Sequence, residues 1–260
     1  MDNAAAPALA QSASPPILSF QSVSLTFGTG VEALRDINLD IRPGEFVSIL
    51  GPSGCGKSTM LRIAAGLVDY TSGELYADRS RVAFTFQDAT LLPWRTVRHN
   101  VELLLELRKV PSDERQRIAQ EKIDLVGLSG FENQYPKHLS GGMRMRVSLA
   151  RALTLDPTLF LFDEPFGALD EITRERLNDE VQALHTRQKF AALFVTHSVA
   201  EAAVMSDRVI VMSARPGRIV GDFRIDLPRP RDEARRFSPE FAAQCGLLSA
   251  ALREASEASA

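Results

Sequence analysis

One short segment, Gly51-Pro-Ser-Gly-Cys-Gly-Lys-Ser58, constrains the fold of this chain more than any other. It has the spacing G-x-x-x-x-G-K-[ST], in which backbone N–H groups surround phosphates and the lysine adds a positive charge. Before it, Phe46–Leu50 is a continuous apolar run, as expected for a buried strand, and after it Thr59–Ala65 has helical periodicity. This order of strand, loop and helix predicts an α/β fold that binds ATP or GTP.

Two further apolar runs also end in residues that carry chemistry. Thr158–Phe162 is followed by Asp163-Glu164, and Ala191–Thr196 is followed by His197. In an open parallel sheet the ligand lies at the carboxyl ends of the strands, so the three strand ends should converge on one nucleotide.

The types of these residues suggest their roles. We expect Asp163 to hold Mg²⁺ together with Ser58, Glu164 to be the general base for the attacking water, and His197 to contact the γ-phosphate. Taken alone, an acidic pair after a strand often only caps a helix, and a histidine at a strand end is often partly buried without a function. The phosphate-binding segment upstream favours the catalytic interpretation.

The overall composition is that of a soluble domain and excludes several classes of protein. The chain has 260 residues, 45% of them hydrophobic, enough for a core of one large or two small domains. Its net charge of −3 gives no basic field for nucleic acid, so no such partner is expected. Cys55 and Cys245 form neither a disulfide framework nor a metal motif, which fits a reducing cytosol. No apolar run is long enough to span a bilayer.

The sequence divides into three regions, the second of which contains an inserted subdomain. Residues 1–17 lack the features of a secretory signal and are interpreted as a disordered leader. Residues 18–227 would form the nucleotide-binding domain, into which a helical subdomain at about 91–150 is inserted, with helices expected over Val97–Val110 and Arg115–Val126.

The C-terminal region, residues 228–260, begins with a charged linker up to Arg236. Ser238 as N-cap and Pro239 at the first helical position predict a helix that ends near Glu257. Its apolar residues suggest docking on the core or on a second copy of the chain; they are Phe241, Leu247, Leu248 and Leu252.

A further motif, Leu139-Ser-Gly-Gly-Met-Arg144, opens a helix upstream of Asp163. Ser140 is a natural N-cap, and Gly141 and Gly142 let the backbone approach a phosphate at the positive end of the helix dipole. With these motifs in this order, residues 18 to 227 resemble the ATP-binding subunit of ATP-binding cassette (ABC) transporters.

The resemblance implies a fold: a P-loop NTPase core of RecA type with an antiparallel β edge and an inserted α-helical subdomain. It also implies roles for individual residues. The Walker A loop, which binds ATP, would comprise Gly51, Pro52, Ser53, Gly54, Cys55, Gly56, Lys57 and Ser58, and Thr59 would also bind the nucleotide. The signature motif would be Ser140, Gly141 and Gly142. Asp163 and Glu164 match Walker B, Asp170 belongs to the dimer-interface loop, and His197 is the switch histidine.

One polar residue and one aromatic residue complete the resemblance. Gln87 matches the glutamine that senses Mg²⁺ and contacts the membrane subunit. Phe27, just before the first core strand, is the candidate to stack on adenine, although Tyr is usual in the family and Phe27 could equally be ordinary strand packing. The segment from Gly73 to Val82 is shorter than the hairpin that the family usually has there, which predicts a trimmed antiparallel edge.

The family's mechanism predicts the partners. Two copies would stack head to tail, with each ATP held by Walker A of one copy and by Ser140–Gly142 of the other. The dimer would drive membrane-spanning permease subunits from the cytoplasmic side of the bacterial inner membrane, and a periplasmic solute-binding protein would deliver the cargo.

Several segments resemble importers of the nitrate, sulfonate and taurine type: Leu91-Leu-Pro-Trp-Arg95, Met143, Asp163–Asp170 and Ala214-Arg-Pro-Gly-Arg218. Each has an ordinary alternative: Trp94, for example, could pack under the helical subdomain, and Pro216-Gly217 is a common hairpin turn. The alternative function is that of a soluble ABC ATPase outside transport, such as an iron–sulfur assembly ATPase.

Overall fold

The computed structural model describes residues 15–257, so most of the predicted leader lies outside the described residues. The larger of two sheets has the strand order β5-β6-β7-β3-β8-β9. Its strands are β3 (Phe46–Leu50), β5 (Val82–Thr85), β6 (Leu159–Asp163), β7 (Ala191–Val195), β8 (Arg208–Met212) and β9 (Ile219–Arg224). All neighbours pair in parallel except β8 and β9, which form an antiparallel hairpin.

The three strands predicted from apolar runs, β3, β6 and β7, are adjacent and buried along their whole length. Their side chains alternate between two cores, as the two-residue period of a strand requires. In β3, Phe46 and Leu50 pack into one core, and Val47 and Ile49 into the other. Burial on both faces explains why these strands are continuous apolar runs in the sequence.

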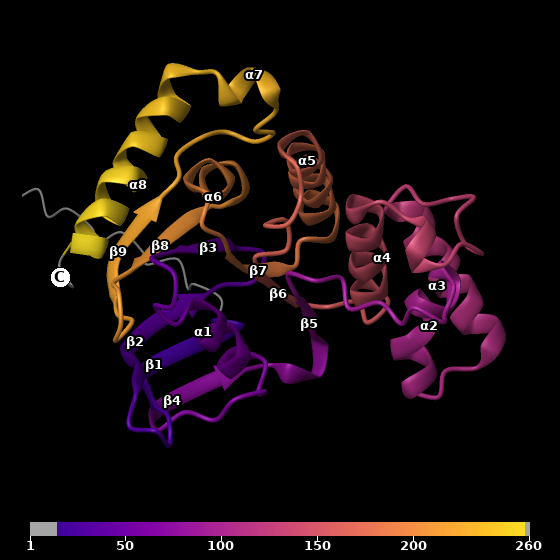
Figure 1. Ribbon diagram of the computed structural model, residues 1–260, viewed down its shortest axis with the longest axis horizontal. Coiled ribbons are helices and arrows are strands. Elements are labelled where there is room, and N and C mark those ends of the chain that lie inside the picture. The colour runs from indigo at the N-terminus through magenta and orange to yellow at the C-terminus, as the bar shows by residue number, and fades with distance from the viewer. Residues whose placement is uncertain (1–14, 258–260) are drawn as a thin grey trace, which may run out of the picture.

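A smaller antiparallel sheet has the order β2-β1-β4, formed by β1 (Leu18–Thr26), β2 (Glu32–Ile41) and β4 (Ser72–Ala77). With helix α1 (Lys57–Ala64), this sheet covers one face of the larger sheet (Figure 1). After β4 the chain makes only a short 3₁₀ turn, η1 (Arg79–Arg81), before it enters β5. The predicted antiparallel edge is therefore present, with a single strand in the shortened segment.

The predicted helical subdomain lies at one end of the molecule, beyond β5 (Figure 1). It contains α2 (Val97–Leu107), α3 (Ser112–Leu125), the 3₁₀ turn η2 (Pro136–His138) and α4 (Gly141–Leu153). The prediction that the first helix reaches Val110 is wrong, because Lys109 has a left-handed backbone (φ 59°) and Val110 precedes Pro111. The proline ring disfavours a helical conformation at the residue before it.

The other face of the larger sheet is covered by α5 (Glu171–Gln188), α6 (Val199–Met205) and α8 (Pro239–Glu257), with the short α7 (Glu233–Arg236) beside them (Figure 1). The predicted start of the last helix is confirmed: the Ser238 hydroxyl accepts a hydrogen bond from the Phe241 N–H at 3.2 Å. Phe241 and Leu248 are buried against the core, whereas Leu247 is 50% exposed, so the predicted docking face does not include Leu247.

The segment interpreted as a charged linker contains a fully buried arginine. Arg231 is only 2% exposed, and its guanidinium lies among backbone carbonyl groups rather than carboxylates. The acceptors are the carbonyl oxygens of Ala203, Val204, Ser206, Ile225 and Leu227. Burial lowers the pKa of Arg231 to about 10, which still leaves it charged at neutral pH. The segment is therefore fixed to the end of α6.

Candidate functional site

The phosphate-binding segment forms a loop between β3 and α1. Gly54 and Gly56 have left-handed backbones, with φ of 74° and 106°, which glycine adopts without strain. A Cβ added at Gly56 would lie 2.7 Å from the Leu34 side chain, so the loop also needs glycine for space. Lys57 is buried, and its ammonium group donates to the carbonyl oxygens of Gly51 at 2.8 Å and Pro52 at 2.9 Å.

The end of β6 contacts this loop. The Ser58 hydroxyl donates to Oδ1 of Asp163 at 2.6 Å, and Asp163 is only 8% exposed. A hydroxyl oxygen and a carboxylate oxygen in contact are ligands of the kind that Mg²⁺ prefers. The residues present therefore fit the predicted metal.

Glu164 has a left-handed backbone with φ of 47°, which is uncommon for a residue other than glycine. Its N–H donates to the carbonyl oxygen of Val195, the last residue of β7, at 3.0 Å. Its carboxylate lies 3.3 Å from Nδ1 of His197, which is exposed. Unusual backbone conformations of this kind cluster at functional sites, where the surrounding contacts hold them in place.

Gln87 follows β5 and is exposed. A Cβ added at Gly167 would lie 3.6 Å from the Gln87 amide nitrogen and 3.7 Å from a Glu164 carboxylate oxygen. The two side chains therefore approach the same glycine from the ends of two adjacent strands. The expected convergence of the strand ends is confirmed by these contacts, while the role of each residue stays a prediction.

A cavity of about 220 Å³ lies over the phosphate-binding loop. Its lining residues are Phe27, Ala33, Ser53, Gly54, Gly56, Lys57, Ser58, Thr59, Glu164 and Arg215. Phe27 is 42% exposed and lies in the turn between β1 and β2, so β1 precedes it and β2 follows it. The exposed ring at the cavity is compatible with stacking on a base and is not ordinary core packing.

Two cavity residues, Ala33 and Arg215, were missed by the sequence interpretation. Arg215 is the one with a charged side chain, and Ala214–Arg218 was taken only as a family marker and a turn. A turn rich in Arg, Pro and Gly after a strand carries no local signal of a contact with a loop more than 150 residues earlier.

The signature residues lie elsewhere, at the start of α4. The Ser140 hydroxyl caps this helix by accepting a hydrogen bond from the Met143 N–H at 3.2 Å, and Ser140 itself is exposed. A Cβ added at Gly142 would lie 2.7 Å from the Thr173 side chain of α5, so close helix packing requires glycine there. The three signature residues do not line the cavity over the phosphate-binding loop.

Asp170 caps α5, because its carboxylate accepts a hydrogen bond from the Thr173 N–H at 3.0 Å. The hydrogen bond from the Thr173 backbone lowers the pKa of this exposed carboxyl group. Asp170 therefore has a local structural role in addition to the predicted place at a dimer interface.

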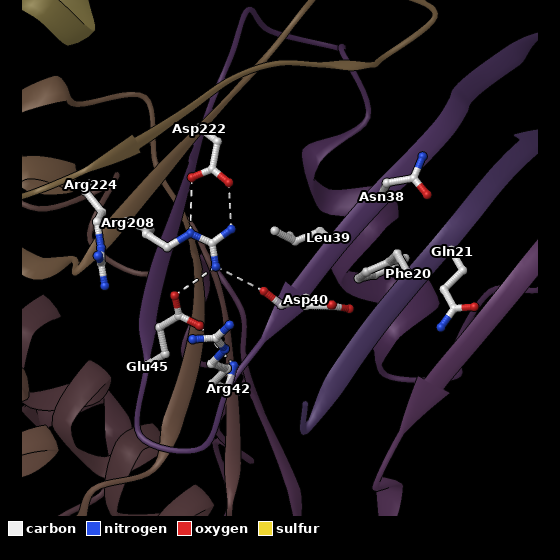
Figure 2. A pocket seen from close by; sticks show the side chains of 10 residues that line it. All are labelled: Phe20, Gln21, Asn38, Leu39, Asp40, Arg42, Glu45, Arg208, Asp222 and Arg224. Carbon is white, nitrogen blue, oxygen red and sulfur yellow. Dashed lines mark hydrogen bonds and ion pairs between the residues drawn. The ribbon is translucent and has the colours of Figure 1, made fainter. Parts of the chain in front are cut away.

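A larger cavity of about 820 Å³ lies at the opposite ends of β3 and β8 (Figure 2). At its centre the Arg208 guanidinium donates to Asp222 at 2.7 and 3.1 Å and to Glu45 at 2.8 Å. The hydrogen bond to Asp222 raises the pKa of Arg208 above its usual value. Its charge is already matched by these two carboxylates, and none of the predicted site residues lines this cavity.

Comparison with known proteins agrees with this geometry. Residues 34–167 match the family described as ABC transporter. An uncharacterized ABC transporter ATP-binding protein of Methanocaldococcus jannaschii is 50% identical over 221 residues, which cover 82% of each chain. An aliphatic sulfonates import ATP-binding protein of Pseudomonas syringae pv. tomato is 47% identical over 78% of this chain and 85% of its own.

A nitrate import ATP-binding protein of Synechococcus elongatus is 44% identical over 76% of this chain but only 32% of its own length. Among solved structures, a dimeric ATP-binding cassette bound to ADP and Pi has a TM-score of 0.71 and 33% identity, covering 81% of this chain and all of that chain. Within residues 15–257, no helix has both the length and the apolar character needed to cross a membrane. The resemblance seen in the sequence is confirmed, and the chain belongs to the ABC transporter family as an ATP-binding subunit with the ABC ATPase fold.

Proposed function

We propose that this chain is the ATP-hydrolysing subunit of an importer for a small solute of the nitrate, sulfonate or taurine type. The observation that carries the proposal is the contact of Ser58 with Asp163, beside the pair of Glu164 and His197, at one phosphate-binding cavity. The names of the sulfonate and nitrate relatives support the class of solute.

In the proposed reaction, Lys57 leaves its carbonyl partners and binds the phosphates of ATP together with the loop N–H groups. Ser58, Asp163 and Gln87 would hold Mg²⁺, which would supply positive charge to neutralise the phosphates. Glu164 accepts the proton of the attacking water, and His197 contacts the γ-phosphate and keeps the Glu164 carboxylate in place through their hydrogen bond.

The site needs a second copy of the chain to close over the γ-phosphate. Ser140 is exposed at the positive end of α4 and outside its own chain's cavity, so it is free to face the ATP of a partner. The dimeric cassette among the solved relatives supports this arrangement. Asp170 and its loop would lie at the same interface.

The subunit would act from the cytoplasmic side of the bacterial inner membrane, bound to permease subunits that receive cargo from a periplasmic binding protein. Trp94 is 70% exposed, which contradicts its alternative interpretation as a residue packed under the helical subdomain. Beside it, Arg95 forms an ion pair with Glu106 at 2.5 Å, and the next residue, Leu107, is 71% exposed. These exposed apolar side chains suit a contact with a permease.

The Glu164→Gln variant tests the proposed site. It keeps the shape of the side chain and removes the general base, so it should bind Mg-ATP, lose hydrolysis and elute from gel filtration as a dimer of the 28.6 kDa chain. The matched control, Glu164→Gln with Lys57→Ala, should stay monomeric because it no longer binds the phosphates. A variant that remains monomeric with Mg-ATP, or dimerises equally without it, would contradict the proposal.

A further inference from the structure

The loop between β8 and β9, residues 213–218, packs directly on the phosphate-binding loop. The N–H of Gly217 donates to the carbonyl oxygen of Ala33 at 3.0 Å, and its carbonyl oxygen accepts from the Arg35 N–H at 3.0 Å. A Cβ added at Gly217 would collide with the carbonyl oxygen of Cys55. Only glycine allows this close approach, so the two loops are in contact backbone to backbone.

The same loop is held rigid by its own hydrogen bonds. The Ser213 hydroxyl donates to the carbonyl oxygen of Pro216 at 3.1 Å and accepts from the Arg218 N–H at 3.1 Å. The Ser213 N–H also donates to the carbonyl oxygen of Arg218 at 2.9 Å. The side chain of Arg215 therefore extends from a fixed turn.

The guanidinium of Arg215 reaches one specific carbonyl group. Its Nη2 and Nε donate to the carbonyl oxygen of Gly54 at 3.0 and 3.3 Å. Among the described residues, no carboxylate lies within ion-pair distance of Arg215. The side chain lines the same cavity as Lys57 and Phe27.

The Gly54 carbonyl matters because of the peptide unit to which it belongs. In a trans peptide the carbonyl of Gly54 and the N–H of Cys55 point in opposite directions. Gly54 has a left-handed backbone, and the Cys55 N–H makes only a long hydrogen bond of 3.4 Å to the carbonyl oxygen of Pro52. The buried Cys55 side chain, 1% exposed, anchors one side of this peptide. On the other side, the Arg215 guanidinium on the Gly54 carbonyl helps to determine where the Cys55 N–H points.

We propose that Arg215 is a positioning residue that orients the Gly54–Cys55 peptide, so that the Cys55 N–H is ready to bind phosphate before the nucleotide arrives. This inference rests on the proposed function only in that the ligand is ATP. Arg215 acts through the loop, so its contribution is to the phosphates that ATP and ADP share. It does not contact the γ-phosphate.

Amide hydrogen exchange of the nucleotide-free protein tests whether Arg215 orders the phosphate-binding loop, without any assumption about the ligand. In Arg215→Ala, the peptide spanning residues 51–58 should exchange faster than in the wild type. Arg218→Ala, which removes an exposed arginine of the same turn, should leave that exchange unchanged. A matching increase in both variants, or none in either, would overturn the inference.

Binding of Mg-ATP and Mg-ADP, measured by fluorescence titration, tests the consequence. Arg215→Ala should raise Kd about tenfold for both nucleotides, the scale of a lost charged hydrogen bond, and leave kcat at saturating ATP within about twofold of the wild type. The Kd of Arg215→Lys should lie between those of the wild type and Arg215→Ala, because an ammonium group cannot reproduce the two-donor contact.

The outcomes separate the two proposals. Weaker binding of ATP alone would show a direct γ-phosphate contact and overturn the positioning role, as would wild-type affinity in Arg215→Ala. A wild-type protein that binds neither nucleotide would instead contradict the proposed function, and the exchange result would still decide whether Arg215 orders the loop.

Discussion

Replacement of Arg231 by methionine should show how strongly the C-terminal segment is tied to the nucleotide-binding domain. Methionine keeps an unbranched apolar stem of similar length and removes every donor. The guanidinium serves five carbonyl oxygens, three of which lie at the end of α6. The substitution therefore leaves a cluster of acceptors without partners in a region that is almost wholly buried.

The cost follows from the hydrogen bonds that are lost. A buried acceptor left without a partner costs about 1–3 kcal/mol, and water can reach some of the carbonyls once α8 loosens. Release of the buried cation offsets part of the loss. We expect a net destabilisation of about 3 kcal/mol, which corresponds to a fall in Tm of about 6–12 °C for a domain of this size.

Thermal unfolding followed by circular dichroism measures this effect, and limited proteolysis shows whether residues 228–257 are released first. Arg253→Ala is the control, because Arg253 is exposed on α8 and makes no described hydrogen bond. The Tm of this variant should differ from that of the wild type by less than about 2 °C. If Arg231→Met also shifts Tm by less than about 2 °C, the carbonyl cluster does not hold the segment and the reasoning is wrong.

Two further predictions concern residues around the nucleotide. Phe27→Ala should weaken ATP binding about tenfold through loss of a stacking surface, while Phe27→Trp should retain it; wild-type affinity of Phe27→Ala in a fluorescence titration would remove Phe27 from the site. Burial raises the pKa of Glu201, which accepts a hydrogen bond from Thr196 and has a second carboxylate oxygen without a partner. Because the folded-state pKa lies above the ordinary value of 4.5, the stability that the protonated form gives is present below that pH and is lost as pH rises through the folded pKa. Glu201→Gln should therefore raise Tm at pH 7.5 and lose most of this gain near pH 4.5; an equal gain at both pH values would contradict the assignment.

The sequence predicted the nucleotide-binding core well because its signals are local. Buried strands such as Phe46–Leu50 are visible as uninterrupted apolar runs, and the loop after that strand needs glycines at fixed positions. The cap of α8 at Ser238 also depends on neighbouring residues. In each case the residues that determine the structure are next to one another in the chain.

The missed features at Arg231 and Arg215 depend on residues far apart in the chain, whereas the early end of α2 depends on the neighbouring Lys109 and Pro111. Arg231 was assigned to a linker because its neighbours are charged, and its burial depends on carbonyl groups of α6 that no composition reveals. Arg215 acquires its contact only because the β8–β9 hairpin folds back on the phosphate-binding loop. The 70% exposure of Trp94 was not predicted either, because a single tryptophan in the sequence does not indicate whether it is buried.

Purification of this subunit from gently solubilised native membranes, with mass-spectrometric identification of what stays bound, tests the central claim most directly. The account predicts recovery of a permease with several membrane spans, and substitution of Trp94 by Ala should reduce that recovery without loss of ATP binding. Recovery of soluble partners alone, from membranes in which other ABC transporters remain intact, would contradict the importer function and favour a soluble ABC ATPase.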